Sequence, residues 1–450
     1  MTAIDDALTT ATDTKAVLVS RGAVSETGRL FTEVFGDATA LVVADENTWR
    51  VTGQAVVDSL VASDVTCLEP YVFPSRPSLY ANYVNVETLR DHAAATDAVV
   101  VVVGSGTLND IAKLASGELG RPYAVVATAA SMDGYAAFGA SITRDGFTIT
   151  RPCPAPALVV ASLDIMATAP SRLTASGYGD LIEKVPGGAD WVVADALGIE
   201  PIDTVAWNLV QPSLRHALAD PAACAAGDVG AISALAEGLL LSGFAMQERQ
   251  SSRPASGAGH NFSHQWEMEG HGLDWNPPLT HGIKVGLGAI ASCALYEAVL
   301  GLDVSGVDPE ARAAEWLTPE EDVARVTALQ PQPAIREQAI VQSQLKYVPA
   351  EQVADRVRAI KAAWPAIIER VRPFLLSPAD VAQRLHKVGA AYHPAQVGIS
   401  QDRLHRTYLQ AQTLRSRYTV LDALYELGLL DRSVDSLFAP GGYWSDWPND

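Results

Sequence analysis

A chain of 450 residues is too long for one hydrophobic core, so its length predicts two domains. Its 48% apolar and 19% charged residues describe a globular protein and exclude an intrinsically disordered one. The net charge of −20 excludes nucleic acid and anionic membrane surfaces as partners, because both require a basic face. It still permits a small phosphorylated substrate held by one or two local cations.

Cysteine spacing and hydropathy bear on the cellular compartment. The four cysteines form no CxxC pair, which indicates neither a disulfide framework nor a thiolate metal site. The acidic segment 1–20 lacks the basic region of a secretory signal, and no unbroken apolar run reaches the ~18 residues of a membrane span. We therefore expect a cytoplasmic protein without membrane insertion.

The first third of the chain alternates apolar runs with segments of helical composition. Four runs indicate strands: 39–45, 98–103, 123–127 and 156–161. Continuous β-branched runs bounded by Gly and Asp are typical of parallel strands covered on both faces. With a helix near 81–96, they predict an α/β domain with a doubly wound parallel sheet over residues 1–165.

Helical patterns dominate the rest of the chain, which predicts an all-helical domain over 166–450. The clearest segments are 222–247, 279–300, 351–371 and 402–430. Apolar residues recur at three- and four-residue spacing from Arg403 to Leu430, which predicts one long helix. Prolines at 319 and 331–333 predict breaks between helices.

A glycine-containing turn follows the strand at 98–103. It consists of Gly104, Ser105, Gly106, Thr107 and Leu108. Glycine lets the backbone approach a ligand, and a helix beginning there would offer free N–H groups to a pyrophosphate. Because the third glycine of GxGxxG is absent, an ordinary strand–helix turn remains the alternative.

Small and hydroxylated residues follow the next strand, at Thr128 and Ser131, with Asp133 close behind. At the carboxyl end of a parallel strand they can line a nucleotide cleft, although Ser131 or Asp133 could equally cap a helix. Asp45 ends the first strand, where it could bind a ribose hydroxyl or be a solvated loop acid.

Three histidines gather in a short part of the helical half. His260 and His264 lie one turn apart on a helix face, and His281 follows. Neutral imidazole is the commonest nitrogen ligand of borderline divalent cations, and a carboxylate such as Asp180 would complete a three-ligand site with an open position. Singly, each histidine could be a core residue and Asp180 a helix N-cap; their clustering favours a metal site.

Six stretches together carry a family resemblance: 104–116, 128–137, 176–184, 252–269, 279–288 and 398–430. They resemble the glycerol-1-phosphate dehydrogenase family, most closely its bacterial AraM-like branch, within the superfamily of iron-type alcohol dehydrogenases and dehydroquinate synthases. The resemblance implies a Rossmann-like domain followed by a helical domain, as in dehydroquinate synthase. It also implies an NAD(P)-dependent enzyme that interconverts dihydroxyacetone phosphate and sn-glycerol 1-phosphate, or a closely related polyol phosphate.

The resemblance further implies roles for individual residues. Asp180, His260 and His281 would hold one divalent metal, usually zinc, with nickel or iron as alternatives. His264 and Asp133 would contact the substrate. NAD or NADP would contact a larger set: Asp45, Gly104, Ser105, Gly106, Thr107, Leu108, Thr128, Ser131 and Ala137. A homodimer or larger homo-oligomer is expected.

Departures from the family pattern leave the substrate open. Family members usually carry Glu-His-His where this chain has Gly259-His260-Asn261, they often have Ser at Ala137, and they match 185–222 poorly. Three alternatives therefore remain: a sugar phosphate cyclase of the dehydroquinate synthase type, a dehydrogenase of an unphosphorylated polyol, and a catalytically silent binding protein. A carboxylate at Asp45 favours NAD or dual use, because it would repel a 2′-phosphate.

Overall fold

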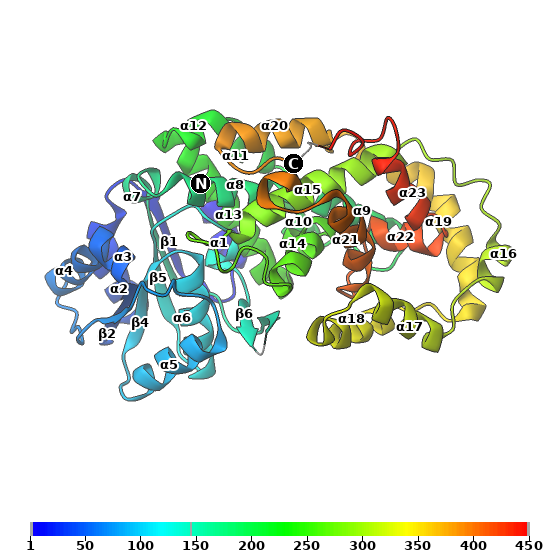
Figure 1. Cartoon of the computed structure of the whole chain (residues 1–450). Helices are drawn as coiled ribbons and strands as arrows, with labels where there is room; N and C mark the ends of the chain where they lie inside the picture. The colour runs from blue at the N-terminus through cyan, green and yellow to red at the C-terminus, as the bar shows by residue number, and fades with distance from the viewer. Residues whose placement is uncertain (1–2, 145, 448–450) are drawn as a thin grey trace. The chain divides into compact units, whose positions relative to one another are not determined.

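The computed structural model describes residues 3–144 and 146–447 (Figure 1). Contacts between residues divide the chain into two compact units. The first, here called the sheet unit, runs to Leu181 and includes Thr204–Ala255 and Lys387–Gly389. The second, the helical unit, comprises Ile182–Asp203, Ser256–His386 and the chain from Ala390 onward. The domain boundary near residue 165 is placed where the composition changes, and it remains a prediction.

A six-stranded parallel sheet forms the core of the sheet unit, with strand order β1-β8-β5-β4-β2-β3. Its strands are β1 (Ala16–Ser20), β2 (Ala40–Asp45), β3 (Tyr71–Phe73), β4 (Val99–Gly104), β5 (Tyr123–Ala127) and β8 (Leu158–Ser162). The four strands predicted from the sequence are β2, β4, β5 and β8. The predicted class, a doubly wound parallel sheet with a large helical part, is confirmed.

Two edge strands and a hairpin were not expected from the sequence. β1 is half-buried along its whole length, and β3 has only three residues. β6 (Ala140–Arg144) and β7 (Phe147–Arg151) pair antiparallel, apart from the main sheet. Short or half-buried strands leave weaker apolar runs than central strands do, so the sequence marks them less clearly.

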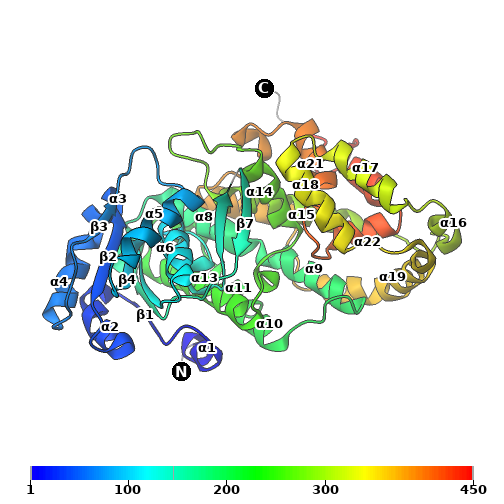
Figure 2. The same ribbon diagram turned by 90° about the horizontal axis from the view of Figure 1, so that it is seen from below.

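Helices cover both faces of this sheet (Figures 1 and 2). On one face Val101 and Val126 pack in a cluster with Phe31 of α2 and Leu60 of α4. On the other, α6 lies against β4 and β5. The helices of this unit are α1 (Ala3–Thr10), α2 (Thr27–Phe35), α3 (Glu46–Thr48), α4 (Gln54–Ala62), α5 (Tyr83–Ala94), α6 (Gly106–Glu118), α7 (Leu163–Ala167), α10 (Thr204–Val210), α11 (Leu214–Ala217), α12 (Pro221–Ala225) and α13 (Val229–Arg249). α8 (Ser171–Ile182) ends at its boundary.

The parallel register brings the carboxyl ends of the central strands to one edge of the sheet. Val43 of β2 pairs with Val102 of β4, and Gly104 pairs with Ala127 of β5. The residues that follow these strands therefore share that edge. The strand order reverses between β2 and β4, which is where doubly wound sheets bind ligands.

The helical unit consists of α9 (Lys184–Ala196), α14 (Ala258–Met268), α15 (His281–Val299), α16 (Pro309–Ala314), α17 (Pro319–Leu329), α18 (Pro333–Leu345), α19 (Ala350–Val371), α21 (Gln401–Thr413), α22 (Val420–Glu426) and α23 (Leu430–Phe438), with most of α20 (Pro378–Val388). The predicted breaks are confirmed, because Pro319 and Pro333 each begin a helix. Proline suits this position, where its missing N–H has no helical partner.

The single long helix predicted from Arg403 to Leu430 is wrong. α21 ends at Thr413, α22 begins at Val420, and a turn over 414–419 separates them. Two carboxylates stabilise the new helix start: the Thr419 N–H donates to Asp422 (2.8 Å) and the Val420 N–H to Asp190 (2.9 Å). The apolar spacing continues across this turn, so periodicity alone could not reveal it.

α14 and α15 approach each other closely in the helical unit. A Cβ atom added to Gly288 would lie 2.1 Å from the carbonyl oxygen of Gly259. No side chain fits at such a distance, so glycine at this position permits the contact.

Two helices, α13 and α15, are long and apolar enough to cross a membrane by length and composition alone. Their apolar windows are 67% and 89% buried, as in core helices of a folded domain.

Replacing Gly288 with Ala tests the contact between α14 and α15. The added methyl would force the two backbones apart, and we expect a loss of about 1–3 kcal/mol in the free energy of unfolding. Gly306→Ala is the matched control, because a Cβ there meets no atom within 4 Å. Denaturant titration of both variants measures the effect, and equal midpoints would contradict the proposed crowding.

Replacing Glu426 with Gln tests the packing behind the 414–419 turn. Burial raises the pKa of Glu426 to about 7, against the opposing charge of Arg356 and a hydrogen bond from Tyr418 (2.8 Å). A raised pKa in the folded state means that the stability present at acidic pH is lost as the pH rises through about 7. We expect Glu426→Gln to be more stable than the parent by up to about 3 kcal/mol at mildly alkaline pH, with the difference vanishing in acid.

Chemical denaturation at several pH values measures this difference. The exposed Glu351→Gln variant is the control and should follow the parent at every pH. A constant offset between Glu426→Gln and the parent would contradict the expected linkage.

Candidate metal centre

Three imidazoles gather where α14 meets the start of α15. His260 and His264 lie one turn apart on α14, and His281 is the first residue of α15. The ring centre of His281 lies 5.6 Å from that of His260 and 5.7 Å from that of His264, while the latter two are 6.1 Å apart. The three predicted histidines therefore form one cluster within the helical unit.

Two of these histidines each have a glutamate carboxylate within hydrogen-bond distance of Nδ1. Nδ1 of His260 lies 2.7 Å from Oε2 of Glu183, whose Oε1 accepts the Gly257 N–H at 3.1 Å. Nδ1 of His281 lies 2.8 Å from Oε1 of Glu267. A carboxylate at Nδ1 fixes the imidazole with its proton there, so Nε2 carries the lone pair, which is the usual arrangement of metal-binding histidines.

Asp180 lies near the end of α8, almost fully buried. Its Oδ2 accepts a hydrogen bond from the backbone N–H of Asp133 at 3.0 Å. It precedes Glu183 by three residues, and the intervening backbone is helical or nearly so, which places both carboxylates on the same side of the chain. That Asp180 joins His260 and His281 as a metal ligand stays a prediction.

His264 is in a different electrostatic setting from its two neighbours. Its Nε2 accepts a hydrogen bond from Nη2 of Arg415 at 2.8 Å, and its Nδ1 lies 3.5 Å from Glu267. Burial, together with the charge of Arg415, lowers the pKa of His264 to about 3. The ring is therefore neutral at physiological pH and carries its proton on Nδ1.

Glu267 is the common partner of this cluster. Besides His281 and His264, it lies 3.7 Å from Nζ of Lys284, which is almost fully buried. Burial alone would raise the pKa of Glu267, but the charges of His281 and Lys284 hold it well below its ordinary value. The acid stays ionised and can fix His281 at any physiological pH.

Glu183, Glu267 and Arg415 were missed by the sequence reasoning. A weak signal existed for the first two, since Glu183 follows Asp180 by three residues and Glu267 follows His264 by three. Arg415 lies in the turn that was predicted as helix.

The predicted dinucleotide residues of the sheet unit lie at the carboxyl edge described above. α6 begins at Gly106, directly after β4, with Ser105 as its N-cap residue but without a side-chain capping bond. A Cβ at Gly104 would lie 2.5 Å from the Leu108 side chain, so this turn needs glycine. Thr107 belongs to the first turn of α6, whose backbone N–H groups lack helical partners.

Asp45 proves to be a helix cap. Its Oδ1 accepts the backbone N–H groups of Asn47 and Thr48, both at 2.8 Å, in a capping box at the start of α3. The two roles considered from the sequence, a ribose contact and a solvated loop acid, did not include this capping bond. The second carboxylate oxygen makes no hydrogen bond within the described chain, and it could still meet a hydroxyl group.

The loop after β5 contains the remaining predicted residues. Thr128 and Ser131 are buried, and the Ser131 hydroxyl lies 3.5 Å from that of Tyr135. The Asp133 carboxylate accepts a hydrogen bond from Ser242 at 2.8 Å. Ala137 is buried in a small apolar cluster with Met246 and Ala255.

Lys113 fixes this loop and was not singled out from the sequence. It is fully buried on α6, and its ammonium donates to the carbonyls of Gly134 (2.7 Å), Ala137 (2.9 Å) and Gly139 (3.1 Å). Three carbonyls satisfy the three donors of an ammonium group, so the lysine ties α6 to the loop.

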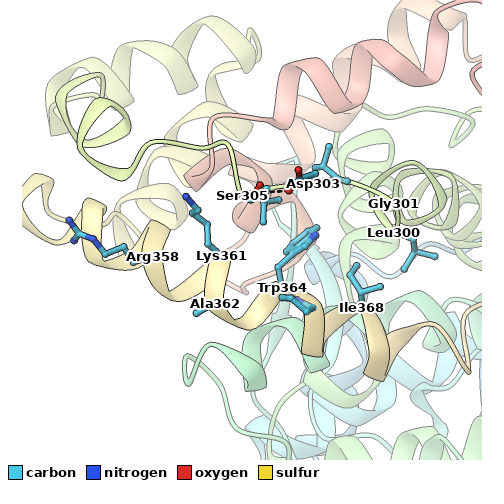
Figure 3. Close-up of a pocket in the computed structure, with 12 residues that line it drawn as sticks. Leu300, Gly301, Asp303, Ser305, Arg358, Lys361, Ala362, Trp364 and Ile368 are labelled. Carbon is cyan, nitrogen blue, oxygen red and sulfur yellow. Dashed lines mark hydrogen bonds between the residues drawn. The ribbon is translucent and has the colours of Figure 1, made fainter.

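A groove of about 840 Å³ lies elsewhere in the helical unit, between the segment after α15 and α19 (Figure 3). Trp364 and Ile368 form its apolar wall, and the Ser305 N–H donates to Asp303 at 2.8 Å. None of the predicted ligand or substrate residues lines it.

Known proteins resemble this chain in sequence. The family model of iron-containing alcohol dehydrogenase matches residues 18–170. The glycerol-1-phosphate dehydrogenase [NAD(P)+] of Halalkalibacterium halodurans is 34% identical over 57% of this chain and 64% of its own length. That of Thermofilum pendens is 34% identical over 63% of this chain and 78% of its own. The chain thus spans slightly less than two thirds of the first of these relatives.

Solved structures of low sequence identity share the fold. Glycerol dehydrogenase from Schizosaccharomyces pombe has a TM-score of 0.59 at 15% identity, covering 98% of this chain and 93% of that one. An iron-containing alcohol dehydrogenase from Corynebacterium glutamicum has a TM-score of 0.58 at 14% identity, covering 94% and 95%. By its sequence relatives, the chain belongs to the glycerol-1-phosphate dehydrogenase family, and it shares its fold with iron-containing alcohol dehydrogenases.

Proposed function

We propose that this protein is a metal-dependent, NAD(P)-linked dehydrogenase that interconverts dihydroxyacetone phosphate and sn-glycerol 1-phosphate. The observation that carries the proposal is the pair of imidazoles of His260 and His281, each oriented by a glutamate at its Nδ1 atom, with Asp180 as the predicted third ligand. The family membership supports the reaction class. The homo-oligomer expected from the sequence stays a prediction.

Asp180, His260 and His281 would hold the metal. Two imidazole nitrogens and one carboxylate oxygen suit a borderline divalent cation such as zinc, with nickel or iron as alternatives, and leave an open position for substrate. A metal bound there supplies a Lewis acid that polarises a substrate hydroxyl or carbonyl oxygen.

NAD or NADP would bind along the carboxyl edge of the sheet, and its nicotinamide supplies the hydride chemistry. The turn Gly104–Leu108 would present backbone N–H groups at the start of α6 to the pyrophosphate. Thr128, Ser131 and Ala137 would border the dinucleotide, and the second oxygen of Asp45 would meet the adenosine ribose, which favours NAD.

His264 and Asp133 would contact the substrate. The neutral His264 ring accepts from Arg415 through Nε2, and its Nδ1 lies 3.5 Å from Glu267, so the substrate contact of His264 rests on the family resemblance. Asp133 keeps its backbone N–H on Asp180, so it would position substrate and metal ligand together.

The reaction is tested by following NADH oxidation with dihydroxyacetone phosphate, with and without a chelator. We expect stoichiometric consumption of NADH that stops when metal is removed. Turnover without net NADH consumption would favour the cyclase, and a preference for unphosphorylated dihydroxyacetone would favour a polyol dehydrogenase. No turnover of any of these substrates would overturn the proposal.

His260→Ala tests the metal ligand directly. Loss of one of three ligands should remove bound metal and abolish turnover, as measured by elemental analysis of the purified protein. His271→Ala is the matched control, because His271 bonds instead to Val397 and Arg403 and should keep its metal. A metal-free and fully active His260→Ala protein would contradict the assignment.

Glu183→Gln tests the orientation of His260. The amide is nearly isosteric but lacks the charge that strengthens the imidazole as a ligand, so we expect metal affinity to fall roughly 10- to 100-fold. Competition with a metal-binding dye measures the affinity. Glu269→Gln serves as the control, since Glu269 pairs with Arg403 and contacts no proposed ligand. Equal affinities in the two variants would argue against the role of Glu183.

A further inference from the structure

Arg415 is a half-buried cation whose two hydrogen-bond partners are uncharged. It lies in the turn between α21 and α22, where Nη2 donates to Nε2 of His264 (2.8 Å) and Nη1 lies 3.5 Å from the Ser256 hydroxyl. Within the described chain, no carboxylate comes within ion-pair distance of it. Glu267 and Glu183 act on Arg415 only at longer range.

Other arginines of the helical unit are paired differently. Arg403 contacts Glu269 at 2.6 Å, and Arg325 contacts Asp322 at 2.8 Å. A buried cation without a counter-ion is costly, so proteins usually supply one. Burial lowers the pKa of Arg415 to about 10, which leaves the guanidinium charged at neutral pH.

The free donors of Arg415 suit an anion. A guanidinium has five N–H donors in a planar fork, and only two hydrogen bonds are made here within the described chain. The residue as a whole is half-buried. Arginine binds phosphate through two parallel hydrogen bonds, which are stronger than neutral ones. Since the chain carries a net charge of −20, an anionic ligand needs such a local cation.

The position of Arg415 suits a small substrate that has a phosphate at one end and its reacting group at the other. His264 separates it from the pair His260 and His281, whose ring centres lie 6.1 and 5.7 Å from that of His264. A phosphate at the guanidinium would leave the other end of a three-carbon chain beside these imidazoles. Lys284 is less suited, because it is buried and faces Glu267.

We propose that Arg415 binds the phosphate of the substrate and makes the site selective for a phosphorylated polyol. This inference rests on the proposed function, because it assigns a specificity-determining residue to the same site.

Kinetics of Arg415→Gln with two substrates test the role. For dihydroxyacetone phosphate, we expect KM to rise roughly 10- to 100-fold, since charge-assisted hydrogen bonds are lost. The kcat/KM for unphosphorylated dihydroxyacetone should fall much less than that for the phosphate, because only the contact of Arg415 with His264 is lost. Arg415→Lys should recover part of the loss, because it restores charge without the fork. If Arg415 only positions His264, both substrates lose equally, and the inference is overturned.

Arg403→Gln is the matched control, because its guanidinium already has a carboxylate partner. Its KM for dihydroxyacetone phosphate should be that of the parent. An equal rise in the two variants would show that the effect is not specific to Arg415.

Calorimetric titration with inorganic phosphate separates this inference from the proposed function. Phosphate binding that disappears in Arg415→Gln supports the inference even if the parent oxidises no NADH with any triose phosphate. Unchanged phosphate binding in a folded Arg415→Gln protein overturns it, even if the parent is an active dehydrogenase. Should Arg415→Gln fail to fold, the same comparison is made with Arg415→Lys, for which weakened binding is expected.

Discussion

The contact between the backbones of α14 and α15 is the constraint on which the histidine cluster depends. Gly259 and Gly288 leave no room for a side chain between the two helices. His260 follows Gly259 directly, and His281 lies two turns before Gly288 on the facing helix. The glycines at the helix contact thus set the distance between His260 and His281. Helices are too stiff to bend and restore that distance if α14 and α15 were held several ångströms further apart.

Buried acids make the same cluster electrostatically unusual. Asp180, Glu183 and Glu267 are each buried or nearly so, whereas Lys284 and Arg415 are the nearby cations within the helical unit. Buried carboxylates are costly unless they are paired, and Glu183 and Glu267 are each paired with an imidazole. A divalent cation would offset the remaining negative charge, so the acids that orient the histidines would also favour the metal.

His264 connects the two ends of this arrangement without being part of either glutamate–histidine pair. Neutral imidazole can accept from Arg415 on one side and donate on the other, which a protonated ring could not do. The turn that supplies Arg415 is itself held by Asp422 and Asp190 at the start of α22. A break in a helix, rather than a helix face, therefore brings the cation to the cluster.

The sequence by itself determined the central strands, the glycine turn after β4, the paired histidines and the helix breaks at Pro319 and Pro333. These features are local, because burial on both faces of a strand or one turn of helical spacing is recorded in adjacent residues. Tertiary structure alone decided the edge strands, the turn that splits the helix expected from Arg403 to Leu430, and the glutamate partners of His260 and His281. Each of these depends on what a segment meets after the chain has folded, and apolar periodicity carries no information about a partner distant in the sequence.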